Sequence, residues 1–392
     1  MENENSKDTN FYSFLHNNRY GRILKIKLFD EKNELINIDT LNYISKNLDI
    51  LSDSGIKILH LITSYERLPK NLFVELCKFY KIVENKIECR VCVNHCYEDD
   101  IFKENQEVRW DIKTIIDANT DIDRICNFIK KNRFSQLETL AFIHNYVGNI
   151  AKYNMSHDIS HLWYYKDQFF AGIYEKLPEV VCMGYASLMK EIIDNLKMPG
   201  LECEVVGVQY EENASNQKCG HARCYLKVKD EKYGIEQSCF DDPTWDRDDD
   251  NGKLWCFAHF AMSNKCHKKE NNDIYSYYVP QFEKFDKNNA KIFVEDYNSC
   301  ECEYDYGVNK LNQEVIERIF LNVLQKTKKS DNFNEIYGKL VDITRRSYIK
   351  QITNGYKGYL KDKKTRLSYL DAKKLYESNL KEIKKYENEM IL

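Results

Sequence analysis

Three segments in the middle of the chain carry a thiol, an imidazole and a carboxylate in an order suited to nucleophilic chemistry. Cys182 opens the segment CMGYASLMKEIIDNLKMPG, His221 opens HARCYLKVK, and Asp242 lies in DDPTWD. A thiolate attacks a carbonyl carbon when a base can take its proton, and a carboxylate can orient that base. The residue types therefore predict a Cys-His-Asp system for acyl transfer.

The nucleophile must be held by a helix for this chemistry to work well. Apolar residues recur at helical spacing from Met189 to Leu196, and Pro199 and Gly200 end the pattern. This predicts a helix that begins at Cys182. The positive end of a helix lowers the pKa of a thiol there, and its exposed backbone N–H groups can stabilise an oxyanion.

Two strands must present the base and the carboxylate. In HARCYLKVK, Ala222 begins an alternating apolar set, which leaves His221 on the opposite face of the strand. The next predicted strand, EKYGIEQSCF, runs into Asp242, and Pro243 ends its ladder. Imidazole and carboxylate are therefore expected at the ends of successive strands.

These three motifs together resemble the transglutaminase-like superfamily. Its members have a Cys-x-x-Tyr-Ala helix start, a His-Ala strand start and an Asp-Pro-Thr-Trp ending, and this chain has VCMGYASL, GHARCYL and FDDPTWD. The resemblance covers residues 135–270 and implies an α+β fold of the papain-like type. It implies that Cys182 is the nucleophile, His221 the general base and Asp242 its partner.

The resemblance leaves two features of the site open. Arg223 and Cys224 stand where many relatives have Trp-Asn after His-Ala, so the local substrate contacts are not defined. An oxyanion hole also needs a donor besides the backbone N–H of Cys182. The indole N–H of Trp163, upstream in the active-site loop, is one candidate, and aromatic packing is the alternative reading of that residue.

The flanking regions differ from this segment in pattern. Strand-like stretches at 22–30, 57–62 and 86–93 alternate with helical ones at 38–55 and 70–82, which predicts a small parallel sheet or a short repeat. After Val308 the sequence is basic, with Leu, Ile and Tyr at mostly helical spacing. We expect the first region to precede the catalytic domain and the second to follow it.

A helix start at Ser135, with Glu138 placed to complete a capping box, marks the beginning of the central domain. We predict an N-terminal α/β domain at 1–133 for partner or substrate recognition, a catalytic domain at 134–307 and a basic helical region at 308–392. The fold class is α+β: the nucleophile helix packs on an antiparallel sheet, after a small β-α-β domain and before helices.

Two metal-like patterns are incomplete. Cys89, Cys92, His95 and Cys96 lack a second CxxC at the usual spacing, and on a strand the first two thiols would point to opposite faces. This also argues against peptide N-glycanase activity, which pairs the same triad with zinc motifs.

The second pattern begins at Asp246 and mimics a calcium loop, but its glycine is one place late and position twelve is Phe257. A solvated acidic loop is the favoured interpretation. We expect no cofactor and no metal.

Composition limits the partners and the location. The net charge of −4 argues against general nucleic-acid binding, although the basic C-terminal region with its interleaved tyrosines leaves a local nucleic-acid contact open. The sequence lacks a signal-peptide pattern and a transmembrane stretch. Its 14 cysteines are then read as reduced thiols of a cytoplasmic protein. We expect a protein or peptide substrate and no membrane partner; the oligomeric state is open.

The predicted reaction is acyl transfer from a peptide or glutamine amide through a thioester acyl-enzyme. Water as the acceptor gives a cysteine protease or deamidase, which we favour, whereas an amine acceptor gives a cross-linking transglutaminase. A third reading belongs to another class: a catalytically inactive scaffold of the same fold that binds protein or RNA.

Overall fold

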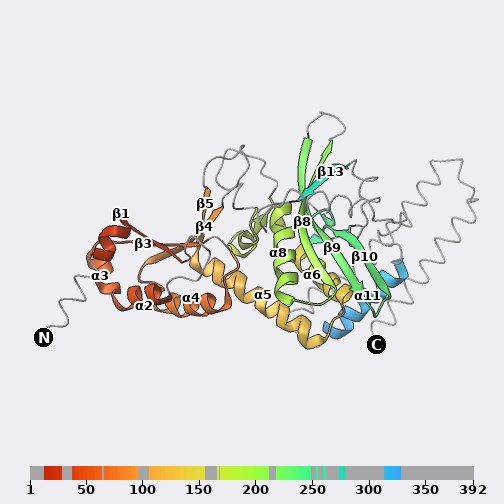
Figure 1. The fold of residues 1–392 in the computed structure, drawn as a ribbon, viewed down its shortest axis with the longest axis horizontal. Coiled ribbons are helices and arrows are strands. Elements are labelled where there is room, and N and C mark those ends of the chain that lie inside the picture. Colours follow the sequence, from red (N-terminus) through yellow and green to blue (C-terminus); the bar gives the residue numbers. More distant parts are fainter. Residues whose placement is uncertain are drawn as a thin grey trace, which may run out of the picture.

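The computed structural model has a mixed α+β fold with several sheets (Figure 1). None of the helices in the described part of the chain is long and apolar enough to cross a membrane. The structure describes residues 13–28, 38–63, 66–95, 106–154, 166, 168–211, 218–248, 253–254, 259–261, 273–278 and 313–327.

The first sheet is built from N-terminal segments. Its three central strands are parallel and follow one another in sequence order, which confirms the predicted parallel sheet, and an antiparallel strand pairs at each edge. Right-handed crossovers between sequential parallel strands place their helices on one face. The strands are β1 (Arg19–Tyr20), β2 (Ile23–Lys27), β3 (Ile58–Thr63), β4 (Glu88–His95) and β5 (Gln106–Asp111).

The helices of this region bury one apolar face each. The sequence suggested one helix over 38–55, but the structure has α2 (Ile38–Lys46) and α3 (Leu48–Asp53). Gly55 then adopts a left-handed conformation with φ of 74°, which suits a residue without a Cβ just after a helix. The predicted helix over 70–82 is confirmed as α4 (Lys70–Val83).

The long helix α5 (Ile112–Asn132) joins the two cores of the molecule. The side chain of Asp111 caps it by accepting a hydrogen bond from the backbone N–H of Lys113 at 2.8 Å. Ile115 packs in the N-terminal core, whereas Ala118 and the later apolar residues of α5 pack in the second core. In Figure 1, α5 accordingly runs from the N-terminal sheet at the left to the second sheet at the right.

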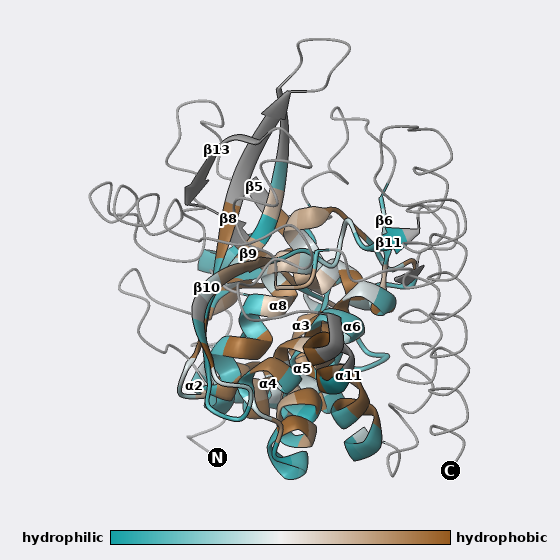
Figure 2. Cartoon of the chain, turned by 90° about the vertical axis from the view of Figure 1, so that its right-hand side faces the viewer, coloured by the Kyte–Doolittle hydropathy of each residue, from teal (hydrophilic) through white to brown (hydrophobic). Residues whose placement is uncertain are grey.

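The second core contains the helix that begins at Cys182. Helix α8 (Cys182–Leu196) packs on β8 and β9 of an antiparallel sheet, and α6 (Gln136–Ile150) packs against α8. In Figure 2, apolar (brown) and hydrophilic (teal) residues divide the surfaces of these helices. The sheet has the order β10-β9-β8-β13, with β8 (Leu201–Glu211), β9 (Lys218–Asp230), β10 (Ile235–Asp241) and β13 (Asp273–Tyr278).

Short elements complete the surroundings of α8. Among the described residues, two small two-stranded sheets and one 3-10 helix lie either before β8 or between β10 and β13 in the sequence. They are β6 (Lys152–Tyr153) with β7 (Glu179–Val180), β11 (Arg247–Asp248) with β12 (Lys253–Leu254), and η1 (Phe170–Tyr174).

The C-terminal helix α11 (Gln313–Thr327) is part of the second core. Ile319, Phe320 and Val323 are buried there, and the Phe320 ring lies 5.1 Å from that of Phe260, centroid to centroid. The remainder of the predicted helical region at 308–392 lies outside the described residues. The domain boundaries remain predictions.

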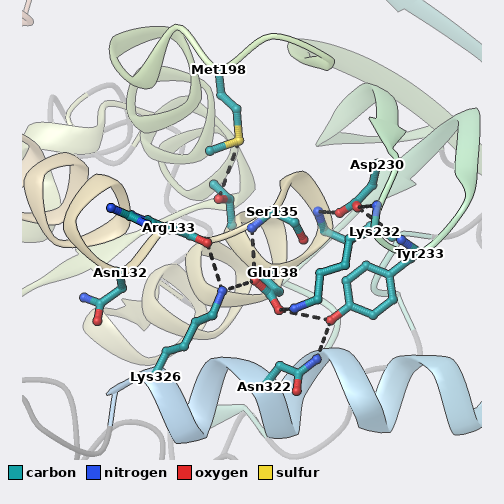
Figure 3. Close-up of polar contacts among 12 residues, drawn as sticks. Asn132, Arg133, Ser135, Glu138, Met198, Asp230, Lys232, Tyr233, Asn322 and Lys326 are labelled. Carbon is teal, nitrogen blue, oxygen red and sulfur yellow. Dashed lines mark hydrogen bonds and ion pairs between the residues drawn. The ribbon is translucent and has the colours of Figure 1, made fainter.

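A buried carboxylate ties α11 to the start of α6 (Figure 3). Glu138 accepts hydrogen bonds from the backbone N–H of Ser135 at 3.0 Å and from the Tyr233 hydroxyl at 3.1 Å. It forms ion pairs with Lys232 and, at 2.6 Å, with Lys326 of α11. The predicted role of Glu138 at the helix start is thereby confirmed, and the same side chain also binds α11.

Candidate active site

The predicted nucleophile lies at the first position of its helix, as expected. Cys182 follows Val181, whose extended backbone precedes the helix, and only 9% of the cysteine is exposed. The thiol accepts a hydrogen bond from the backbone N–H of Ala222 on β9 at 3.3 Å. This contact links Cys182 to β9 next to His221. The prediction that His221 begins its strand was wrong, because the pairing of β9 with β8 extends back to Lys218.

The imidazole and the carboxylate meet beside the thiol. Nε2 of His221 lies 2.5 Å from Oδ2 of Asp242, and both side chains are buried. Because Nε2 is engaged by the carboxylate, Nδ1 is the nitrogen left for the hydrogen bond between His221 and Cys182. The other oxygen of Asp242 accepts from the backbone N–H of Thr244 at 3.1 Å. Hydrogen bonds therefore connect the three predicted residues in the order Cys182, His221, Asp242.

Electrostatics favour a charged thiolate–imidazolium pair. Burial would raise the pKa of Cys182, but the charge and hydrogen bond of His221 outweigh it, so the pKa is lowered. Burial would lower the pKa of His221, but Asp242 and Cys182 raise it to about 10. Burial opposes ionisation of Asp242 as well, yet His221 holds its pKa below the usual value. The proton thus resides on the imidazole when the thiol is ionised.

An indole ring supports the imidazole. Trp245 stacks on His221 with ring centroids 4.3 Å apart and planes only 9° from parallel, and its edge contacts His259 at 5.4 Å. The face of an indole attracts a cation, so this contact favours the imidazolium form. The sequence contained Trp245 within DDPTWD, but its role was not predicted.

A second histidine–carboxylate group is joined to this site through Asp241, the neighbour of Asp242 in the chain. His144 of α6 is fully buried, with Nδ1 2.7 Å from Asp241 and Nε2 3.3 Å from Asp246. Asp246 also accepts from both the backbone N–H and the Nδ1 of His259. Sequence reasoning assigned His144 no role, because its partners are 97 or more residues away.

The charges of this second group are mutually compensated. Burial would lower the pKa of His144, but the two carboxylates raise it to about 9. Burial would raise the pKa of Asp246, yet His259 and His144 lower it to about 2. The pKa of Asp241 is raised, because burial outweighs its contacts with His144. His144 is therefore an imidazolium held between carboxylates.

The other predicted site residue cannot be placed. Trp163, the candidate second donor of the oxyanion hole, lies outside the described residues. Its role remains a prediction.

The metal-like patterns have structural explanations where they are described. Cys89 packs in the N-terminal core and Cys92 lies on the opposite face of β4, whereas the His95 side chain and Cys96 are outside the described part. Asp246 of the calcium-like loop forms ion pairs with His144 and His259. Among the described residues, no three His, Cys, Asp or Glu side chains are grouped to hold a metal ion.

No protein-family model matches the sequence of this chain, and no curated protein matches it.

Proposed function

We propose that this protein is a transglutaminase-like cysteine enzyme that transfers the acyl group of a peptide or glutamine amide through a thioester. The observation that carries the proposal is the buried, hydrogen-bonded series Cys182, His221 and Asp242. Within it the pKa of the thiol is lowered and that of the imidazole is raised. The motifs that resemble the transglutaminase-like superfamily support it. On this proposal, α8 and the sheet β8–β10 form a papain-like core.

In the first step the Cys182 thiolate attacks the carbonyl carbon of the amide, and a carbon–sulfur bond forms. Negative charge moves to the carbonyl oxygen, where N–H groups at the start of α8 can stabilise it. The intermediate collapses with cleavage of the carbon–nitrogen bond, and His221 gives its proton to the departing amine or ammonia. A thioester and a neutral imidazole remain.

In the second step the acceptor attacks the thioester. His221, now neutral, takes a proton from water while the water oxygen bonds to the carbonyl carbon of the thioester. The carbon–sulfur bond then breaks, which releases a carboxylic acid and the Cys182 thiolate. Asp242 stabilises the imidazolium that forms again. We propose water as the acceptor because the sequence shows no motif for an amine as second substrate, and the enzyme would then be a protease or a deamidase.

Mass spectrometry of treated proteins tests the proposal. Lysate proteins incubated with the wild type should gain new chain termini or a one-dalton deamidation shift, and those incubated with Cys182→Ala should not. Cys126→Ala, which removes a buried thiol of α5, is the matched control and should behave as the wild type.

Each outcome of this experiment is informative. Amine adducts on glutamine would replace the hydrolase by a cross-linking transferase. Identical product sets from the wild type and Cys182→Ala would overturn the catalytic proposal and favour the inactive scaffold.

A further inference from the structure

The Asp242 carboxylate depends on a short turn for its position. Asp242 is the first residue after β10, and its neighbour Asp241 is the last residue of that strand. The Asp242 side chain contacts His221, whereas that of Asp241 contacts His144. Two adjacent residues at the end of β10 therefore contact two different histidines.

The segment 259–261 lies against this turn and is held by the carboxylates of Asp241 and Asp246. The backbone N–H of Asp242 donates to the carbonyl oxygen of His259 at 3.0 Å. His259 is fixed in turn by Asp246, and the backbone N–H of Ala261 donates to Asp241 at 2.9 Å. The carboxylates of Asp241 and Asp246 thus hold the segment that supports the Asp242 backbone.

His144 is the side chain that joins these two carboxylates. Asp241 and Asp246 face its ring, and the Phe260 ring lies nearly perpendicular to it with centroids 5.5 Å apart. Phe260 packs on Phe320 of α11, so the site is closed on that side by apolar rings. A cation in this enclosed place compensates two buried carboxylates, which would otherwise repel each other.

Helix α6 makes a second contact with the same turn. Nη1 of Arg247 donates to the carbonyl oxygen of Gly148 at 2.8 Å, and its guanidinium lies 4.8 Å over the Tyr185 ring of α8. The turn is therefore anchored on α6 at two points, through His144 and through Gly148. The contact of His144 is the closer one to Asp242, because its partner Asp241 is the adjacent residue in the chain. The anchoring of the turn also reaches the helix of the nucleophile.

We infer that His144 is a positioning residue for the proposed reaction: by bridging Asp241 and Asp246 it holds the turn that presents Asp242 to His221. The inference rests on the proposed function. A displaced Asp242 stabilises the imidazolium less, so the thiolate–imidazolium pair should exist over a narrower range of pH. His144 does not touch the reacting atoms.

The test is the pH dependence of iodoacetamide alkylation at Cys182, resolved by peptide mass spectrometry. In His144→Gln, the midpoint of thiolate formation should rise by about one pH unit, which means about tenfold slower alkylation below the midpoint. Thr139→Ala, which changes another buried polar residue of α6, should keep the wild-type midpoint. Circular dichroism and thermal unfolding confirm that each variant is folded.

If His144→Gln does not fold, Asp246→Asn provides the second variant, because it removes one bridged charge and keeps the side-chain volume. It should shift the midpoint in the same direction. A folded variant of either kind with the wild-type midpoint would overturn the inference. The proposed function fails in a different way, through a wild-type Cys182 whose alkylation follows that of ordinary thiols.

Discussion

The buried Glu138 offers a stability test of how the C-terminal helix is attached. Its carboxylate is fully buried, and it binds Lys232 and Lys326, whose side chains remain 45% and 30% exposed. Hydrogen bonds to charged groups contribute about 1.5–3 kcal/mol each. Both lysines can regain water when the charge is removed, so the losses are not additive.

Glu138→Gln keeps one acceptor oxygen and loses the charge. We expect the free energy of unfolding to fall by about 2–3 kcal/mol. Glu138→Ala, which removes every acceptor from a buried site, should cost about 3–5 kcal/mol. Urea unfolding at neutral pH measures both, and hydrogen exchange of the segment 313–327 should accelerate in the two variants.

The pH dependence gives a second reading of the same contact. Burial opposes ionisation of Glu138, but Lys232 and Lys326 lower its pKa below the usual value. Its contribution is therefore complete above the unfolded pKa of about 4.3 and is lost as the pH falls through the lower folded value. The difference between wild type and Glu138→Gln should shrink over this acidic range.

A matched control decides whether the effect is specific. Glu236 pairs with Lys229 on the surface, where its side chain is 72% exposed. Glu236→Gln should change stability by no more than about 0.5 kcal/mol. Our reasoning about α11 would be refuted if Glu138→Gln were no more destabilising than Glu236→Gln, or if exchange in 313–327 were unchanged.

Three further substitutions test other contacts. Gly200→Ala should lower stability by at least about 1–2 kcal/mol, because φ is 78° and a Cβ would lie 2.7 Å from a β9 carbonyl oxygen; an unchanged melting temperature would contradict this. Burial raises the pKa of Glu66 despite its hydrogen bond from Ala171, so wild-type stability relative to Glu66→Gln should fall as pH rises, and parallel melting curves would argue against it. Trp245→Leu should lower the pKa of His221, as NMR titration would show, by about 0.5–1 unit; an unchanged titration would remove the indole from the account.

The three residues of the proposed triad could be identified in the sequence because local signals place each of them. A helical stripe locates the start of α8 at Cys182, alternation locates His221 on its strand, and Pro243 marks the end of β10 beside Asp242. Each signal depends on residues close by in the chain. The contact of Cys182 with β9 is not encoded locally, and the structure supplies it.

His144 could not be found in this way. Nothing near it in sequence indicates that α6 will pack beside the end of β10, and a buried histidine on an apolar helix is commonly structural. Its two carboxylate contacts appear only when the tertiary fold brings Asp241 and Asp246 to it.

Helix α5 was not predicted, although its sequence contains the signals of a helix. Its buried residues recur at helical spacing from Ile112 to Ile129, and Asp111 caps its first turn, so a sufficient signal was present. The break between α2 and α3 was the opposite case, because the apolar spacing runs on through Asn47 while the backbone there leaves the helical conformation. Periodicity reports burial better than it reports continuity.

The central claim is that Cys182 is ionised by its pairing with His221. The chain contains a reference thiol for this claim: Cys77 of α4 is half-buried, and burial raises its pKa. Iodoacetamide alkylation of the native protein, followed at both cysteines by peptide mass spectrometry across pH, measures the two thiols in one sample. We predict that Cys182 alkylates at a pH well below the range in which Cys77 reacts, because pairing with His221 lowers the pKa of Cys182 whereas burial raises that of Cys77. Alkylation of Cys182 with the same pH dependence as Cys77 would contradict the account.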